Sequence, residues 1–233
     1  MGLTRQKANK KMGHLHPGRN PHHENHPHIM TLKRPYCPHC QRPLTACLCT
    51  LACALTSPWP VVILQDPTEA RQAKGSVPLL QACLQPVTVW IGDDFSQHAG
   101  LNALLQDPQL APLLVYPGHE AHSAAHHQAT LAGRTPCFVL LDGTWRKSLK
   151  LLHSHPALAS LPRLTLATPT QSDYHIRKSP RADGLSTFEA VSAILGEWSG
   201  NPTAYAPLSA SFQAWMQREL ARLPAEVRRR YPS

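Results

Sequence analysis

Four cysteines lie within thirteen residues, as Cys37-Pro-His-Cys40 and Cys47-Leu-Cys49. Zinc prefers four soft ligands in a tetrahedron, and two close thiolate pairs on tight turns supply that geometry. In a chain inside the cell this spacing favours a metal site over disulfides, with free or redox-active cysteines as the alternative. Because four ligands close the coordination shell, we predict a structural zinc site and not a catalytic one.

The other potential ligands near this cluster are fewer and less regular. His39 and Cys53 are near enough in sequence to replace one of the four ligands, although His39 points away if both flanking cysteines bind. Cys83 and Cys137 are flanked by apolar residues, which predicts small core side chains without a role in metal binding.

A second group of reactive side chains lies in Leu140-Leu-Asp-Gly-Thr-Trp-Arg-Lys147. Asp142 follows an apolar run and precedes a predicted helix, so we expect its carboxylate at the carboxyl end of a strand, where open α/β sheets bind ligands. Thr144 is the predicted N-cap, and a helix N-terminus favours a negative group nearby. The alternative is an ordinary turn aspartate, which an isolated Asp-Gly pair would favour.

Two further stretches are Tyr174-His-Ile-Arg-Lys178 and Leu185-Ser-Thr-Phe-Glu-Ala190. In the second, Ser186 or Thr187 together with Glu189 predicts a helix that begins with a capping acid. Between residues 142 and 181 there are seven Lys or Arg and two acids. Charged residues are most often a solvated surface, but this asymmetry around one strand-end carboxylate favours a polyanionic partner.

The elements that must position these groups follow from the apolar pattern. Short apolar runs typical of buried strands alternate with helix-like stretches. The runs are 61–64, 87–91, 113–116, 137–141 and 163–166, and the helix-like stretches are 69–83, 98–106, 144–154, 187–198 and 208–222. The alternation predicts an α/β fold, with a mostly parallel sheet and helices on both faces.

Length and composition define the organisation of the chain. The 233 residues suit one domain with a small appendage, and a hydrophobic content of 42% argues against overall disorder. We predict a disordered arm over 1–36, a four-cysteine zinc knuckle over 37–57 and an α/β domain over 58–233, to which the family resemblance described below assigns catalysis. No apolar run is long enough to cross a membrane and no signal peptide is evident, so we expect a soluble, cytoplasmic protein.

The predicted arm is basic and rich in histidine. It holds seven Lys or Arg against one acid, which is two thirds of the net charge of +9, and six of the fifteen histidines. With few apolar residues, it cannot bury enough surface to offset the entropy of ordering. Metal binding by the histidines, attraction of nucleic acid and a solvated tail without a role are the alternatives for its function.

Six segments of the chain resemble the DTW-domain family, in the order and approximate spacing of that family. They are CPHC…CLC (37–49), ILQDPTEA (63–70), LLVYPG (113–118), DGTW (142–145), YHIRKSP (174–180) and LSTFEA (185–190). The resemblance covers about residues 37–200 and implies a knotted, SPOUT-like α/β core. It also implies transfer of the 3-amino-3-carboxypropyl group of S-adenosylmethionine to N3 of a tRNA uridine, with release of 5′-methylthioadenosine.

The resemblance also implies roles for individual residues. It places Asp142 at the active site, either as the general base for the uridine N3 proton or as the ligand of the donor's cationic amino group. Lys147, Arg177 and Lys178 are implied for tRNA phosphates, which add affinity without base specificity. The residues implied for the S-adenosylmethionine pocket are Leu141, Gly143, Thr144, Trp145, Leu185, Ser186, Thr187 and Glu189, with a core role as the alternative for Trp145.

One position departs from the family, and two other functions are consistent with the residues. Family members often read Gln-His-Pro where this chain has Gln65-Asp66-Pro67. The chain could instead be a SPOUT-like RNA methyltransferase, or a zinc-containing RNA-binding module without activity. The product separates these functions, because methylthioadenosine indicates aminocarboxypropyl transfer, S-adenosylhomocysteine indicates methylation and neither product indicates a binding protein. The sequence defines no oligomeric state.

Overall fold

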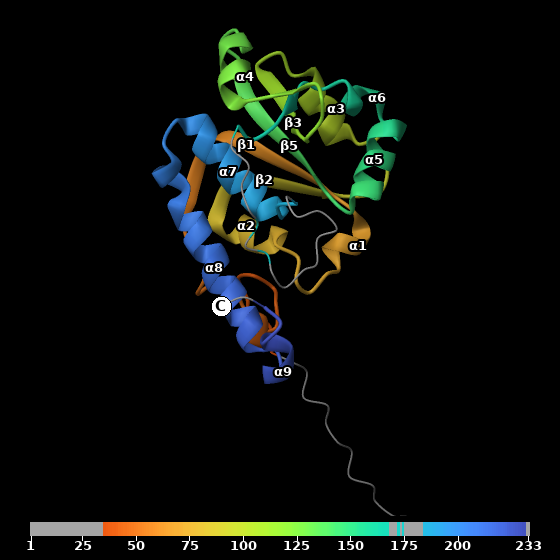
Figure 1. Ribbon diagram of the computed structural model, residues 1–233. Helices are drawn as coiled ribbons and strands as arrows, with labels where there is room; N and C mark the ends of the chain where they lie inside the picture. Colours follow the sequence, from red (N-terminus) through yellow and green to blue (C-terminus); the bar gives the residue numbers. More distant parts are fainter. Residues whose placement is uncertain (1–34, 168–171, 173, 175–183, 232–233) are drawn as a thin grey trace, which may run out of the picture. The chain divides into compact units, whose positions relative to one another are not determined.

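The computed structural model describes residues 35–167, 172, 174 and 184–231. Within these residues six strands form one sheet in the order β2-β1-β5-β3-β6-β4, and every neighbouring pair is parallel (Figure 1). The strands are β1 (Leu55–Gln65), β2 (Leu84–Ile91), β3 (Leu110–Val115), β4 (Ala121–His122), β5 (Thr135–Asp142) and β6 (Arg163–Leu164). Each predicted apolar run overlaps one of these strands, and the predicted α/β class is confirmed.

The helices of the described residues follow the predicted alternation, except that one predicted helix is divided and three further short helices were not predicted. They are α1 (Pro67–Ala70), α2 (Val77–Cys83), α3 (Ala99–Gln106), α4 (Ala124–Thr130), α5 (Trp145–Ser154), α6 (Pro156–Ala159), α7 (Thr187–Ser199), α8 (Ala206–Ala221) and α9 (Ala225–Arg228). The single helix expected over 69–83 is wrong, because Pro78 has no N–H to donate and must lie in the first turn of a new helix. α4 was not predicted, since its Ala- and His-rich sequence has no apolar periodicity.

The two faces of the sheet are covered by different helices. Ile63 and Phe138 point to the face on which α2, α7 and α8 pack, and Val62 and Val139 point to the face of α3, α5 and α6 (Figure 1). Successive side chains of a strand alternate between faces, so two buried faces require an uninterrupted apolar run. This is why the central strands read as continuous apolar stretches in the sequence.

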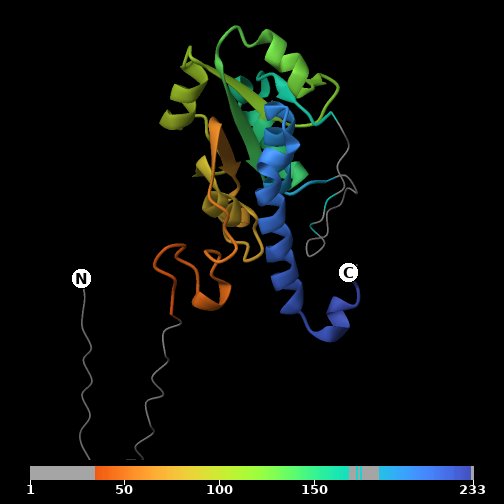
Figure 2. The ribbon, with the colours of Figure 1, turned by 90° about the vertical axis from the view of Figure 1, so that its left-hand side faces the viewer.

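The cysteine-rich segment packs against α8 and α2. Leu48 is 2% exposed and belongs to the same apolar cluster as the core-facing side chains of both helices. At the C-terminal end of α8, Arg218 and the C-cap residue Arg222 donate hydrogen bonds to the carbonyl oxygens of Cys47 and Thr45. The segment and α8 lie next to each other in Figure 2 as well. The fold of the segment is therefore tied to the position of this helix.

Several predictions concern other parts or properties of the chain. Residues 1–34, which make up nearly all of the predicted basic arm, lie outside the described residues. The knot of the backbone and the division into arm, knuckle and catalytic domain stay predictions. None of the helices in the described residues has the length and apolar character needed to cross a bilayer.

Candidate active site and metal centre

Asp142 is the last residue of β5, and its carboxylate is held by two side chains from other elements. Gln65, at the end of the neighbouring strand β1, donates from Nε2 to Asp142 Oδ2 over 2.8 Å. Thr187, the first residue of α7, donates from Oγ1 to Asp142 Oδ1 over 2.5 Å. Gln65 is only 5% exposed. The two hydrogen bonds fix the orientation of a half-buried carboxylate at the carboxyl end of the sheet, where the sequence predicted it.

Asp66 lies beside Asp142 and joins β1 to α5. Its N–H donates to the Asp142 carbonyl oxygen over 2.9 Å. Its carboxylate caps α1 by accepting from the N–H of Thr68 over 2.8 Å. The same carboxylate forms a 2.7 Å ion pair with Lys147 Nζ from the first turn of α5. Lys147 therefore links the start of α5 to the end of β1, and Asp66 has a defined structural role.

The ion pair lowers the pKa of Asp66. Burial raises this pKa, but the hydrogen bonds from Lys147 and Thr68 outweigh burial and bring it to about 2, from an ordinary value of 3.8. A carboxyl whose pKa is lower in the folded state stabilises the fold fully above its unfolded pKa. That contribution is lost as the pH falls from about 4 toward about 2.

Replacing Asp66 by asparagine should remove this acid-sensitive part of the stability. We expect Asp66→Asn to cost at most about 2 kcal/mol at pH 7 and progressively less as the pH falls below about 4, because the wild-type carboxylate becomes protonated. Urea unfolding at pH 7, 4 and 3 measures the difference. Asp107→Asn is the matched control, since the Asp107 carboxylate accepts from the N–H of Gln109 in a turn and forms no ion pair among the described residues. Equal pH dependence for wild type and Asp66→Asn would contradict the assignment.

A cavity of about 330 Å³ opens beside Asp142, between the ends of β1 and β5 and the start of α5. Leu64, Leu141 and Leu151 form its apolar part, and Asp142 with Lys147 and Lys150 gives it charged groups. A cavity of this size is within the range that binds small-molecule ligands. The position agrees with the rule that parallel sheets bind ligands beyond the carboxyl ends of their strands.

The residues expected for the donor pocket lie in three places. Leu141 and Gly143 line the cavity beside Asp142. Thr144 caps α5 by accepting from the N–H of Lys147, and the Trp145 ring is 5.4 Å from the ring of Tyr116.

The remaining donor-pocket candidates surround the start of α7. Ser186 and Glu189 form a reciprocal capping box, which confirms the predicted helix start. Thr187 contacts Asp142, and Leu185 is half-buried just before the helix. None of these four is among the residues that line the cavity.

The basic residues proposed for RNA are only partly described. Arg177 and Lys178 lie outside the described residues. Lys147 lines the cavity, but Asp66 offsets its charge. Arg146 and Lys150 on the same helix are exposed.

Sequence reasoning missed Gln65 and Thr68 as members of the site. Both follow the apolar run of β1, and a search for polar residues at every strand end would have found them. Their contacts with Asp142 and Asp66 depend on β1 lying next to β5 and on the local turn into α1.

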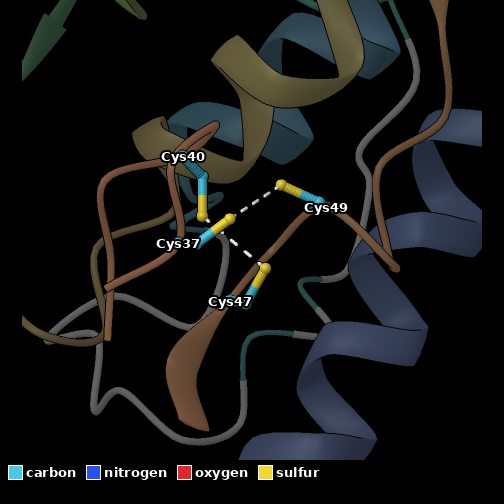
Figure 3. Close-up of side chains that lie close together, drawn as sticks. All are labelled: Cys37, Cys40, Cys47 and Cys49. Atoms are coloured by element: carbon cyan, nitrogen blue, oxygen red, sulfur yellow. Dashed lines mark hydrogen bonds between the residues drawn. The ribbon is translucent and has the colours of Figure 1, made fainter. Parts of the chain in front are cut away.

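The four cysteines of the predicted zinc site come together as expected (Figure 3). The Sγ atoms of Cys37, Cys40, Cys47 and Cys49 all lie within 4.8 Å of one another. The distance from Cys37 to Cys49 is 3.7 Å, and that from Cys40 to Cys47 is 3.8 Å. Zinc–sulfur bonds of about 2.3 Å in a tetrahedron separate the sulfurs by about 3.8 Å. The cluster therefore fits a tetrahedral metal ion, and no other such group occurs among the residues that the structure describes.

The thiols of the cluster shift one another's pKa in opposite directions, and the sulfur contacts with Cys37 and Cys47 raise the pKa of Cys49 to about 12. Burial raises the pKa of the Cys40 thiol, but hydrogen bonds from the N–H groups of Leu48 and Arg42 and from neighbouring thiols bring it down to about 6. The thiolate is the form that binds metals. Burial raises the pKa of Cys137 to about 12, as expected for a core thiol. Cys53 hydrogen-bonds to the carbonyl oxygen of Cys83 and is not part of the cluster.

A family model described as DTW domain matches residues 34–220. The chain belongs to the DTW domain family. The matched DTW span contains the cysteine cluster, Asp142, Thr187 and all but the last residue of α8, so both sites lie within it. α9 lies beyond the match.

Three curated relatives are similar to this DTW protein, and each is named tRNA-uridine aminocarboxypropyltransferase 2. The Drosophila melanogaster protein is 32% identical over 180 residues, which cover 73% of this chain and 69% of the relative. The Mus musculus protein is 31% identical over 70% of this chain, and the Macaca fascicularis protein is 30% identical over 70%. The alignment spans 56% of the length of each of these two mammalian relatives. No solved structure gives a significant match.

Proposed function

We propose that this DTW protein transfers the 3-amino-3-carboxypropyl group of S-adenosylmethionine to N3 of a tRNA uridine and releases 5′-methylthioadenosine. The observation that carries the proposal is the Asp142 carboxylate, held by Gln65 and Thr187 beside a cavity at the carboxyl ends of two parallel strands. The names of the three relatives support the same reaction.

The cavity residues fit the donor in size and chemical character. Leu64, Leu141 and Leu151 offer apolar contacts, and Gly143 gives the strand end a surface without a side chain. When bound, the donor supplies a carbon that is activated by the neighbouring sulfonium. Binding geometry then selects the reaction, because the aminocarboxypropyl carbon and not the methyl group must face the uridine.

We assign Asp142 the role of general base. The N3–H bond of uridine breaks as its proton moves to the carboxylate, and the nitrogen lone pair forms the new N–C bond. The C–S bond breaks in the same displacement, and its electron pair stays on the sulfur of methylthioadenosine. Each carboxylate oxygen has a second lone pair besides the one used by Gln65 or Thr187, so it can accept the proton without losing its support.

Basic side chains near the cavity supply the contacts to the tRNA backbone in this proposal. Arg146 and Lys150 on α5 are exposed, and Lys147 has a further N–H to donate besides those bound to Asp66 and Thr68. Arg177 and Lys178 are proposed for the same role. Such contacts make RNA affinity depend on salt but do not choose the base.

We also propose that Cys37, Cys40, Cys47 and Cys49 hold one structural zinc ion. The sulfur spacing fits a closed tetrahedral shell, which has no open position for catalysis. The contacts of the segment with α8 support a role in stabilising the fold.

Product analysis tests the proposed reaction. We expect incubation with S-adenosylmethionine and bulk tRNA to give equal amounts of methylthioadenosine and aminocarboxypropyl-uridine, measured by mass analysis of the nucleosides. We expect the reaction in the cytoplasm, where tRNA and donor are both present. S-adenosylhomocysteine with a methylated nucleoside would identify a methyltransferase instead, and tRNA binding without either product would identify a binding protein.

A further inference from the structure

A second cavity, of about 520 Å³, lies between the C-terminal part of α8 and the segment that follows it. Leu220, Ala221 and Ala225 form its apolar floor, and its polar lining is Gln217, Arg228, Arg229 and Tyr231. We call this cavity the α8–α9 groove. It shares no lining residue with the cavity beside Asp142, and all of its lining residues except Gln217 and Leu220 lie beyond the span matched by the DTW family.

The charge around the α8–α9 groove is strongly positive. Arg228, Arg229 and Arg230 are consecutive and exposed, and Glu226 is the only acid between residues 220 and 231. The other acid nearby, Glu219, already pairs with Arg222 over 2.7 Å. Among the described residues, no carboxylate forms an ion pair with the three consecutive arginines. The groove therefore combines an apolar floor with a rim suited to an anion.

The Arg228 side chain is held in place over the groove. Its Nη2 is 3.4 Å from the carbonyl oxygen of Ala221 and 3.3 Å from that of Leu223, at the end of α8. These contacts are long, and they leave the other N–H groups of the guanidinium for a ligand. An apolar surface next to an aromatic ring and arginines is the combination that binds single-stranded nucleic acid, where bases stack and phosphates pair with charge.

We propose that the α8–α9 groove binds one unstacked nucleotide of the tRNA, with its base against Tyr231 and the apolar floor and its phosphate on Arg228 and Arg229. The identity of the RNA rests on the proposed function. An apolar peptide fits the rim poorly. Binding it would remove water from the three arginines without supplying a counter-charge. RNA supplies that counter-charge as well as a flat ring for the floor.

The position of the groove defines its role. α9 lies at the end of α8 that is remote from the sheet (Figures 1 and 2). Arg218 and Arg222 of the same helix end hold the cysteine segment, so the groove is built on a braced element. A contact away from Asp142 adds affinity for the tRNA without touching the reacting atoms. It should therefore change the KM for tRNA and leave kcat unchanged.

Binding of fluorescently labelled bulk tRNA, followed by anisotropy without donor, tests the proposal. We expect Tyr231→Ala to weaken binding about fivefold or more, since stacking on an aromatic side chain contributes about 1–3 kcal/mol per base. Tyr231→Phe keeps the ring and should bind like wild type. Arg229→Ala should weaken binding and reduce the salt slope by about one, while Arg134→Ala, an exposed arginine outside the groove, should do neither.

Three results would overturn the groove as a nucleotide site. The first is that Tyr231→Ala binds tRNA like wild type, and the second is that Tyr231→Phe loses as much tRNA affinity as Tyr231→Ala. The third is that the wild type is a dimer which Tyr231→Ala dissociates without a change in RNA affinity. Thermal melting and zinc content identify a variant that has simply misfolded.

The groove and the transferase proposal fail in different ways. If wild type releases methylthioadenosine and the groove variants keep the wild-type KM for tRNA, the groove is wrong and the transferase stands. If wild type gives no methylthioadenosine but Tyr231→Ala still weakens RNA binding, the transferase is wrong and the groove stands.

Discussion

Asp142→Asn is expected to abolish measurable release of methylthioadenosine, since a general base typically contributes about 10²–10⁴ to the rate. The amide cannot accept the N3 proton. The amide oxygen can still accept from Gln65 Nε2, and the NH₂ group can donate to the Thr187 hydroxyl, which accepts as well as donates. The orientation of the side chain is therefore kept while its basicity is lost.

The measurement is a single-turnover time course with enzyme in excess over tRNA, paired with calorimetric binding of S-adenosylmethionine. Asp93→Asn is the matched control, because Asp93 lines the same cavity, is exposed and lies outside the DTW signature. We expect a much smaller effect there. Normal donor binding with a near wild-type rate in Asp142→Asn would show that Asp142 is not the base. Loss of donor binding would instead identify Asp142 as the ligand of the donor's amino group.

The sequence predicted the position of Asp142 but not what holds it. Its place at a strand end follows from the local pattern of an apolar run, Asp-Gly and a helix start. Its partners Gln65 and Thr187 are 77 and 45 residues away in the chain. They reach Asp142 only because β1 is the neighbour of β5 and α7 begins at that edge, and strand order is not encoded in local periodicity.

Counting basic residues in the sequence overestimated the free positive charge around Asp142. Lys147 counts as one of seven basic residues around Asp142, yet in the fold its ammonium pairs with Asp66, which is 81 residues away. In the sequence, Asp66 was a departure from the family and was not recognised as the partner of Lys147. The strand ends that bring Asp66 and Lys147 together are distant in the chain. The free positive charge on α5 is therefore carried by Arg146 and Lys150.

The cysteine cluster was fully predictable for the opposite reason. All four cysteines lie within thirteen residues, so the turns that join them determine the geometry without help from the sheet. What the sequence did not show is that the segment also packs on the protein core. Leu48, between Cys47 and Cys49, is buried in the cluster of apolar residues that includes α2 and α8. A change in the fold of this segment should therefore affect the packing of α2 and α8.

Replacing Cys40 and Cys47 together by serine is expected to remove the metal and to lower the melting temperature markedly. Structural zinc binds zinc-finger peptides with about 10–16 kcal/mol of apparent free energy, which is comparable with the entire stability of about 5–15 kcal/mol of a typical domain. Without it, Leu48 loses its fixed position and α8 loses the carbonyl partners of Arg218 and Arg222. Elemental analysis should find about one zinc per wild-type chain and almost none in the variant.

Two controls separate this cluster from other sources of metal binding. Cys53→Ser makes the same chemical change at a thiol that hydrogen-bonds to Cys83 and lies outside the cluster, so it should retain the zinc. Deletion of residues 1–33 removes six histidines and should also retain it. Metal lost on that deletion would assign the ion to the histidines. If the metal survives this deletion but is lost in the double serine variant, the four thiolates hold it. No other group of ligands in the described residues is spaced to replace them.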